Sequence, residues 1–285
     1  MRLGEALAQA VTRLGNGGVD SPRLDAELLL AHVLEVNRAA ILARPEQRLT
    51  PKELTRYRNL VTRRASREPL AYILGHREFY GLDFAVDARA LIPRPETELL
   101  VEHALSIARR AAKQPETTLQ IADVGAGSGA IAVTLAVHLR RATLYALDDS
   151  AGALAVVAEN ARRHRVDGRV HCLQSDLLSA LPGPVDLITA NLPYVTSEEW
   201  PDLAPEIRDH EPRTALDGGP DGLDLIRRLL ATAGPYLHPG GALLLEIGAS
   251  QGASVTALAG KHLPQARVQV HQDYAGLDRL VIAST

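Results

Sequence analysis

The first part of the chain repeats its apolar residues at the spacing of a helix. Apolar positions recur every three or four residues over 2–14 and again over 23–36. Asp20-Ser21-Pro22 offers a cap and a first-turn proline for the second stretch, and Thr50-Pro51-Lys52-Glu53 opens a third one in the same way. We therefore expect a small helical domain over residues 1–75.

The pattern then changes to short strand-like pieces. Residues 75–86 carry two of them, joined at a glycine, which predicts a β-hairpin. The two prolines in Leu91-Ile92-Pro93-Arg94-Pro95 hold the next stretch extended. A helix is expected over 98–112, with Pro115 closing it. We assign residues 76–95 to a hairpin and an extended linker.

Residues 96–285 alternate apolar strand-like runs with amphipathic helical stretches, the pattern of a doubly wound α/β sheet. Only six residues separate the last two runs, too few for a crossover helix, so these strands should pair antiparallel. The prediction is a seven-stranded sheet with one antiparallel strand. The strands are expected at 119–124, 143–148, 169–175, 185–191, 241–247, 266–272 and 279–284, and the helices at 129–140, 151–165, 222–233 and 250–262.

Composition narrows the class of protein. The 285 residues are 46% apolar and 4% aromatic, and no apolar run approaches the roughly 18 residues that a membrane-spanning helix needs. The first residues form an amphipathic segment and do not resemble a signal peptide. One cysteine excludes an intrachain disulfide, and the ten histidines show no metal-ligand spacing. We expect a cytoplasmic monomer without membrane contact or bound metal.

Charge is distributed unevenly along the chain. Residues 1–75 carry a balance of +4 and the remainder −7, within a net charge of −3. A basic front end suits an acidic partner or RNA, or it is a solvated helical surface. Because phosphate contacts dominate affinity for RNA, the −7 of the larger part argues against a nucleic-acid substrate.

The stretch 185–194 is the first candidate for chemistry. An apolar strand-type run ends in Asn191-Leu192-Pro193-Tyr194, and the strand should stop near Asn191 because Pro193 cannot donate to a sheet ladder. Ligands of open α/β sheets bind at such carboxyl strand ends. Two acceptor oxygens, on the Asn191 side chain and the Leu192 carbonyl, and the ring of Tyr194 suit a planar NH2 group. An ordinary strand-to-loop turn is the alternative.

A glycine-rich turn, Asp123-Val124-Gly125-Ala126-Gly127-Ser128-Gly129, follows the first strand and opens a helix. Its glycines let the backbone turn sharply and approach a ligand closely. The dinucleotide fingerprint spaces its third glycine one residue further on. Asp148 ends the next strand, at about the distance from the turn at which a carboxylate holds a ribose diol. A helix N-cap is the alternative role for Asp148, although Ser150 can serve instead.

Asp176 and Leu177 follow the third strand of the predicted sheet. The Asp176 carboxylate either faces an adenine amino group or caps the apolar segment behind it, and the sequence leaves both roles open. A glycine turn and two strand-end acids fit S-adenosylmethionine better than NAD, because S-adenosylmethionine has a zwitterionic methionine part and no pyrophosphate.

Together, the glycine turn and Asn191-Leu192-Pro193-Tyr194 resemble the Class I S-adenosylmethionine-dependent methyltransferases that modify amide or exocyclic NH2 groups. Arg77-Glu78-Phe79-Tyr80-Gly81, Leu91-Ile92-Pro93-Arg94-Pro95-Glu96-Thr97-Glu98 and Glu211-Pro212-Arg213-Thr214-Ala215-Leu216 are similar to segments of the HemK/PrmC family. The likeness covers nearly the whole chain. It implies a Class I (Rossmann-like) sheet behind a helical substrate-recognition domain. It also implies methyl transfer to the N5 amide of the glutamine in the Gly-Gly-Gln motif of peptide chain release factors, leaving S-adenosylhomocysteine.

The resemblance also implies which residues form the site. The substrate amide would sit on the catalytic residues Asn191, Leu192, Pro193 and Tyr194. Its two N–H groups would donate to the Asn191 and Leu192 oxygens and aim the nitrogen lone pair at the methyl group, so no strong base is required. The cofactor would lie on Gly125, Ala126, Gly127, Ser128, Gly129, Asp148, Asp176, Leu177 and Asn191.

Two positions depart from the family pattern. Leu192 replaces the first of two usual prolines, and Leu177 stands where some relatives carry an aromatic residue. Asn-Leu-Pro-Tyr is typical of ribosomal RNA adenine dimethylases, so an RNA adenine N6-methyltransferase is one alternative. A ribosomal-protein glutamine N5-methyltransferase and a non-catalytic S-adenosylmethionine binder are the others. The loop 196–222 is expected to border the substrate entrance.

Overall fold

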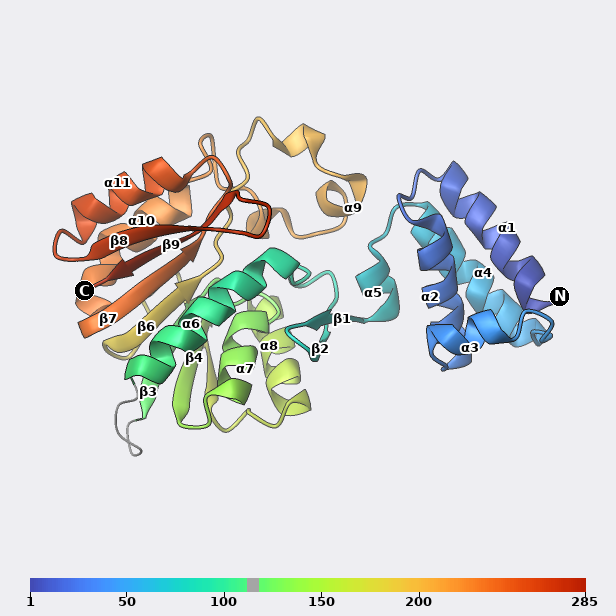
Figure 1. Cartoon of the computed structure of the whole chain (residues 1–285), viewed down its shortest axis with the longest axis horizontal. Coiled ribbons are helices and arrows are strands. Elements are labelled where there is room, and N and C mark those ends of the chain that lie inside the picture. Colours follow the sequence, from blue (N-terminus) through green and yellow to red (C-terminus); the bar gives the residue numbers. More distant parts are fainter. Residues whose placement is uncertain (112–117) are drawn as a thin grey trace. The chain divides into compact units, whose positions relative to one another are not determined.

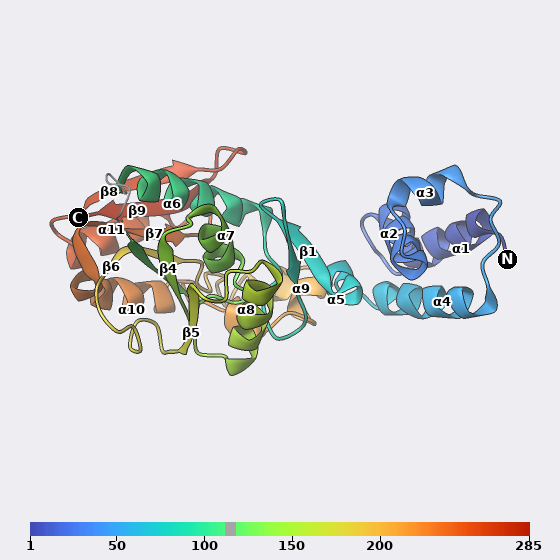
Figure 2. The same ribbon diagram turned by 90° about the horizontal axis from the view of Figure 1, so that it is seen from below.

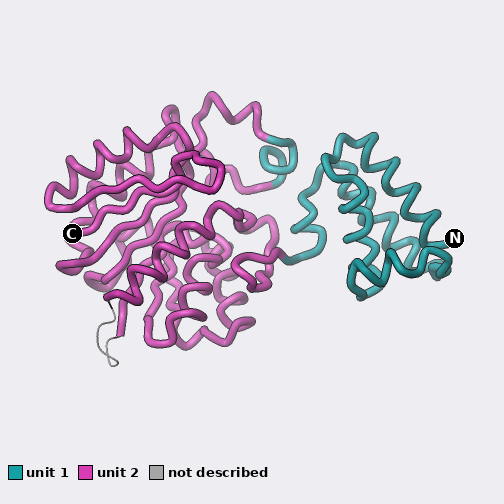
Figure 3. Tube along the Cα trace, viewed as in Figure 1, with its two compact units in different colours: residues 1–76, 204–210 teal, residues 77–203, 211–285 magenta. Residues whose placement is uncertain are grey.

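A computed structural model describes residues 1–111 and 118–285. By their contacts these residues form two compact units, Met1–His76 with Ala204–His210, and Arg77–Leu203 with Glu211–Thr285 (Figure 3). The expected domain limits at 75 and 95 stay predictions. The helix expected over 98–112 is α6 (Glu98–Ala111), and its predicted last residue and Pro115 lie outside the described residues.

The smaller unit is a bundle of helices around an aliphatic core. Residues at the predicted helical spacing, including Leu3, Leu14, Leu29 and Leu30, are fully buried between the helices. Tyr57 is buried with them, and its hydroxyl donates to the Ala26 carbonyl at 3.0 Å. The helices are α1 (Leu3–Asn16), α2 (Pro22–Leu34), α3 (Arg38–Ala43), α4 (Pro51–Ala65) and α5 (Leu70–Leu74), with α9 (Pro205–Arg208) from later in the chain.

Local signals predicted the long helices of this unit and missed the short ones. Thr50 and Glu53 form a reciprocal capping box at the start of α4. Pro22 occupies the first turn of α2, but the Ser21 side chain makes no capping hydrogen bond within the described chain, so the expected cap is wrong there. The helices α3 and α5 were not predicted because five or six residues are too few to show a helical period.

Arg64 of α4 is buried, which differs from the solvated surface considered for the basic front end. Its guanidinium donates to Asp25 at 2.7 Å and to Glu206 of α9 at 2.9 Å. Arg67 reaches the other oxygen of Glu206 at 2.6 Å. Burial alone would raise the pKa of Glu206, but hydrogen bonds from both arginines hold it below its ordinary value. This cluster ties the segment 204–210 to the helical unit.

The larger unit begins with the predicted hairpin, β1 (His76–Phe79) and β2 (Leu82–Ala85). Tyr80 and Gly81 join the strands, and both have positive φ, as a two-residue turn of the primed type requires. Phe79 and Phe84 are buried and meet edge to face, with centroids 6.1 Å apart. The hairpin leads through a 3-10 turn, Pro95–Thr97, into α6.

The sheet has seven strands in the order β5-β4-β3-β6-β7-β9-β8. All neighbours are parallel except β9, which pairs antiparallel with both β7 and β8 and confirms the predicted reversed strand. The seven-stranded α/β fold is therefore confirmed. The strands are β3 (Leu119–Val124), β4 (Ala142–Asp148), β5 (Val170–Gln174), β6 (Val185–Ala190), β7 (Leu237–Glu246), β8 (Arg267–Gln272) and β9 (Asp278–Ser284).

Helices cover both faces of this sheet (Figures 1 and 2). On one face α6, α7 (Ala130–His138) and α8 (Ala151–Arg163) lie side by side, and on the other α10 (Asp224–Ala233) packs against α11 (Gly252–His262). The central strands β3 and β6 are buried along nearly their whole length because helices cover both of their faces, whereas the edge strand β5 is partly exposed. Because β5, β4, β3, β6 and β7 pair parallel, their carboxyl ends share one edge of the sheet.

Candidate active site

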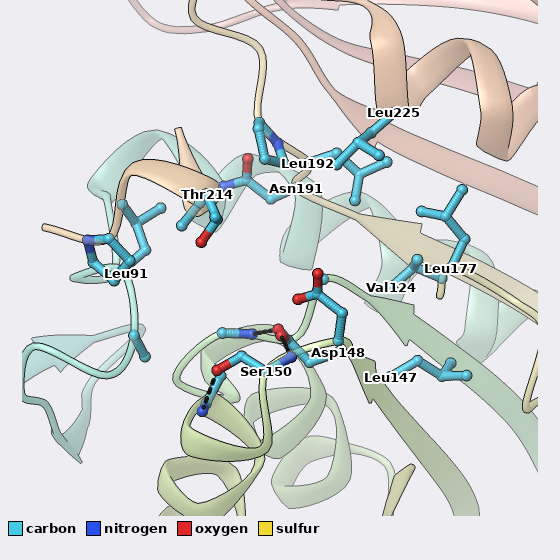
Figure 4. Close-up of a pocket in the computed structure, with 18 of the residues that line it drawn as sticks. Leu91, Val124, Leu147, Asp148, Ser150, Leu177, Asn191, Leu192, Thr214 and Leu225 are labelled. Atoms are coloured by element: carbon cyan, nitrogen blue, oxygen red, sulfur yellow. Dashed lines mark hydrogen bonds between the residues drawn. The ribbon is translucent and has the colours of Figure 1, made fainter. Parts of the chain in front are cut away.

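A cavity of about 870 Å³, measured with its open mouth, lies at the carboxyl edge of the sheet. Its wall includes residues from the ends of β3, β4, β5 and β6 and from the segments 89–91 and 212–215. Figure 4 shows Asn191 on one side and Asp148 on the opposite side, with Leu91 and Thr214 at one end and Leu177 at the other. The structure thus brings together side chains that the strand-end rule predicted from three separate strands.

The glycine turn after β3 forms the floor next to Asp148. Gly125 and Gly127 have φ of +72° and +54° and line the cavity, and a side chain would disfavour both conformations. The Gly127 N–H donates to Asp148 Oδ2 at 2.8 Å. Gly129, with φ of +80°, serves packing, since a Cβ there would lie 3.1 Å from Val157 of α8. Ala126 and Ser128 are buried behind the turn.

Asp148 accepts hydrogen bonds from two backbone N–H groups and leaves further lone pairs toward the cavity. Its Oδ1 takes the Ser150 N–H at 2.9 Å, and Ser150 itself caps α8 by accepting from Ala153. The capping alternative for Asp148 is therefore excluded. Burial raises the pKa of Asp148, and the two N–H donors oppose that shift. A carboxylate held this way suits a vicinal diol, which donates two O–H groups.

The Asp176 side chain lies at the cavity rim and pairs with Arg228 of α10 at 2.6 Å. Both side chains are more than half exposed, so this ion pair is screened and weak. Leu177 lines the cavity with φ of +51°, an unusual conformation for a leucine. Leu225 of α10 lines the same cavity. These aliphatic side chains make this part of the wall apolar, which suits contact with a flat ring.

Asn191 follows β6 and is oriented by a hydrogen bond. Its Nδ2 donates to Thr97 Oγ1, at the start of α6, at 3.1 Å, which leaves Oδ1 as the acceptor of the side chain. Leu192 and Pro193 continue the cavity wall, and Leu192 is buried against the glycine turn, where a Cβ on Gly125 would stand 3.0 Å from its Cδ2. Asn191, Leu192 and Pro193 thus all line the cavity.

Tyr194 is turned toward the sheet. Its hydroxyl donates to Glu246 Oε1 at 3.3 Å, and burial raises its pKa. Its carbonyl accepts from Gln251 Nε2 at 3.1 Å. Among the described residues the cavity wall includes Asn191 and Pro193 but not Tyr194, so the ring is placed behind this wall.

Part of the predicted entrance loop supports the Asn191–Tyr194 segment from behind. The Val195 N–H donates to the Leu216 carbonyl at 3.0 Å, and the Gly218 N–H donates to the Val195 carbonyl at 2.8 Å. A Cβ on Gly222 would stand 2.3 Å from the Tyr194 carbonyl oxygen, so only glycine fits there. These contacts fix the backbone just beyond Asn191 and Leu192.

Two family models match the chain. One is the PrmC N-terminal domain, over residues 5–75, and the other is the methyltransferase small domain, over residues 97–210. The release factor glutamine methyltransferase of Moorella thermoacetica is 46% identical over 284 residues, covering 99% of this chain and 98% of that protein. The protein of the same name from Deinococcus radiodurans is 41% identical over 283 residues, with the same coverage of both chains. This chain belongs to the release factor glutamine methyltransferase family.

The likeness to solved structures extends to more distant methyltransferases. The 16S rRNA N2 G1207 methyltransferase of T. thermophilus, solved with AdoMet and guanosine, is 18% identical. It covers 74% of this chain and 49% of its own, with a TM-score of 0.51. At this identity the match shows the fold alone. It agrees with the Class I fold that the resemblance implied.

Two of the segments that resemble the family are joined by a buried carboxylate. Glu211, whose side chain is 1% exposed, accepts from the Ile92 N–H at 3.1 Å and from the Arg94 guanidinium. The prolines on either side of Arg94 keep this segment extended, so that both the Ile92 N–H and the Arg94 guanidinium reach Glu211. Leu91 and Pro212, next to the joined residues, line the cavity. The two segments therefore form one end of the cavity.

Glu246 and Thr97 are site residues that sequence reasoning missed. Glu246 ends β7 and is 1% exposed, and Thr97 is 4% exposed. Burial raises the pKa of Glu246 to about 7, while Thr97, Tyr194 and the charge of Arg279 oppose that rise. The available signal was an acid at the end of a predicted strand, the same signal that identified Asp148.

In the described part of the chain, no group of three or more His, Cys, Asp or Glu side chains is arranged to hold a metal ion. None of the helices in that part is long and apolar enough to cross a membrane.

Proposed function

We propose that this chain transfers one methyl group from S-adenosylmethionine to the side-chain amide N5 of the glutamine in the Gly-Gly-Gln motif of peptide chain release factors. S-adenosylhomocysteine is the product. The observation that carries this proposal is Asn191, whose Nδ2 is engaged by Thr97 so that Oδ1 stays an acceptor on the cavity wall. The family membership supplies the substrate class.

The residues of the cavity fit S-adenosylmethionine. The positive-φ glycines Gly125 and Gly127 form a cradle in which side chains would be strained, and Asp148 supplies acceptors for a ribose diol. Asp176 and Leu177 border the place for the adenine, while Ala126, Ser128 and Gly129 shape the turn from behind. When bound, this cofactor supplies the reactive methyl group on a sulfonium.

The protein's own contribution to the reaction is alignment. Asn191 Oδ1 and the Leu192 carbonyl accept the two N–H groups of the substrate amide, so that its nitrogen lone pair points into the cavity. The same two oxygens would stabilise the positive charge that develops on the amide nitrogen as it accepts the methyl group. The nitrogen then loses one proton to water. Pro193 and Tyr194 complete the acceptor segment and hold its backbone.

We propose that the protein acts as a cytoplasmic monomer, with residues 1–75 contacting the release factor and residues 76–95 linking them to the catalytic part.

One assay tests the function. The protein and isotope-labelled S-adenosylmethionine are incubated with a release factor, with the same factor carrying alanine for the motif glutamine, with ribosomal proteins, and with ribosomal RNA. We expect label only on the intact release factor, and peptide mass spectrometry should place one methyl group on the motif glutamine. Label on a ribosomal protein or on RNA would select one of the alternative substrates.

A further inference from the structure

A buried group of three side chains stands behind Asn191. In the parallel pair β6 and β7, Ala190 lies opposite Leu245, so the next residues, Asn191 just after β6 and Glu246 at the end of β7, lie side by side. Thr97, from the turn before α6, meets Asn191 at 3.1 Å, and Tyr194 meets Glu246 at 3.3 Å. Segments far apart in the sequence therefore converge on one carboxylate that the alignment mechanism does not use.

The hydrogen bonds of this group are incomplete at the carboxylate. Glu246 Oε1 accepts from the Tyr194 hydroxyl, while Oε2 has no hydrogen bond of normal geometry among the described residues. Thr97 is nevertheless close enough to Glu246 to lower the pKa of its carboxyl. A buried acceptor without a hydrogen bond lowers the stability of the fold, and an apolar residue would lower it less at this position. The presence of the carboxylate therefore points to a role other than stability.

A carboxylate next to Thr97 determines how that hydroxyl is used. A hydroxyl group can donate or accept, whereas an ionised carboxylate only accepts. With Glu246 beside it, Thr97 directs its proton toward the carboxylate and keeps its lone pairs for Asn191 Nδ2. The Asn191 amide is then fixed with Nδ2 toward Thr97, which leaves Oδ1 as its acceptor. A flipped amide would present NH2 to the substrate NH2, and two donors cannot bond each other.

We propose that Glu246 is a positioning residue for methyl transfer, acting through Thr97 and Tyr194 to hold the Asn191 side chain in the orientation that accepts the substrate amide. This inference rests on the proposed function. Glu246 does not line the cavity formed by the described residues, so its effect passes through the side chains that it holds.

The charges around Glu246 give the proposal a pH signature. Arg279 of β9 favours the ionised carboxylate, Glu96 of the turn before α6 disfavours it, and Thr97 and Tyr194 supply hydrogen bonds. Burial outweighs the favourable contacts and raises the pKa of Glu246 to about 7. The protonated form carries a hydrogen that competes with Asn191 for Thr97 Oγ1. The kcat of the wild-type enzyme should therefore rise as the pH passes through about 7.

The experiment compares Glu246→Gln, Thr97→Val and Thr97→Ser with the wild-type full chain. For each protein we would measure kcat and KM with release factor, cofactor affinity by calorimetry, and kcat between pH 6 and 9. Glu102→Gln, the same exchange at an exposed position of α6, is the matched control. Glu246→Gln and Thr97→Val should lower kcat on the order of 10- to 100-fold, the loss typical of a misaligned reacting group.

The other readouts separate positioning from folding and binding. We expect KM and cofactor affinity to stay near wild type, Thr97→Ser to keep most of the activity, and the rise of kcat near pH 7 to disappear in Glu246→Gln. Wild-type kcat and pH profile in Glu246→Gln would overturn the inference. If that variant does not fold, Thr97→Val decides, and wild-type turnover there overturns it too. Absence of release factor methylation by the wild-type protein would instead refute the proposed function.

Discussion

Replacing Asn191 by alanine tests the acceptor site most directly. The side chain now donates through Nδ2 to Thr97 and borders the cavity, so the exchange removes the Oδ1 acceptor and frees the Thr97 hydroxyl together. Asn191 follows the last residue of β6 and is only half-buried, so no apolar core contact is lost. The hydrogen bond to Thr97 contributes about 1 kcal/mol to folding, which the protein should tolerate.

The loss of catalysis should be much larger than the loss of stability. One preorganised hydrogen-bonding group at a reacting centre contributes about 3–4 kcal/mol to transition-state stabilisation, or about 100- to 1,000-fold in kcat. After the exchange the substrate amide has one hydrogen-bond acceptor left, the Leu192 carbonyl, and can rotate about that single hydrogen bond. We therefore expect the fall in kcat to lie toward the larger of these values.

Single-turnover transfer of labelled methyl to release factor, with both partners saturating, measures this loss without the binding steps. Cofactor affinity, from calorimetric titration, should stay near wild type because Gly125, Gly127 and Asp148 are untouched. Asn191→Asp is the informative companion: it keeps an oxygen toward the substrate but cannot donate to Thr97, and it adds a charge beside buried Glu246. It should lose nearly as much. Turnover close to wild type in Asn191→Ala would refute the assigned role.

Three further predictions concern other groups. Asp148→Ala should weaken cofactor affinity about tenfold or more in calorimetric titration, because a charge-assisted hydrogen bond contributes about 1.5–3 kcal/mol; unchanged affinity would remove Asp148 from the cofactor site. Arg64→Met should cost about 3–5 kcal/mol in denaturant unfolding because it strands the Asp25 carboxylate, whereas Arg63→Met, at a half-exposed position, should cost far less. Burial raises the pKa of the Asp123 carboxyl to about 7. The contribution of Asp123 to folding stability is therefore complete below about pH 4 and is lost as the pH rises through 7. Asp123→Asn should therefore reduce the fall of Tm between pH 5 and 8, and an identical fall in both proteins would contradict the assignment.

The strands of the sheet could be predicted from the sequence to within a residue or two, with one exception. Each apolar run between turn residues is long enough for one buried strand, and 119–124 matches β3 at both ends. The exception is β7, which begins at Leu237 and not at 241. Leu237 pairs with Val185 before a shift in register. His238, Pro239 and Gly240, which separate Leu237 from the apolar run, are partly or fully exposed and include residues typical of turns, so they conceal the start of the strand.

The residues of the candidate site also fall into two groups, those that a local sequence pattern places and those that only tertiary packing places. Asn191 and Asp148 were predictable because Asn191 directly follows its strand and Asp148 ends its own, so a local pattern is enough to place each of them. Glu246 also ends a strand, but its meaning depends on Thr97, whose position is set by where α6 begins. Arg64 likewise has the sequence signature of a surface arginine, but in the structure it is buried and pairs with Asp25 of α2 and Glu206 of α9. Pairings of this kind depend on tertiary packing, which local periodicity does not encode.

Leu192, the departure from the family pattern in the acceptor segment, finds its explanation in the glycine turn. Its side chain is 3% exposed and packs where a side chain on Gly125 would otherwise stand, with Cδ2 only 3.0 Å from that Cβ position. The missing side chain of Gly125 therefore serves two purposes, close approach of the backbone to a ligand and room for Leu192. A proline at position 192 would restrict φ directly, whereas the leucine is held by burial against the turn. Either device immobilises the Leu192 carbonyl, the proposed acceptor of the substrate amide, and here the same glycine turn that borders the cavity holds it.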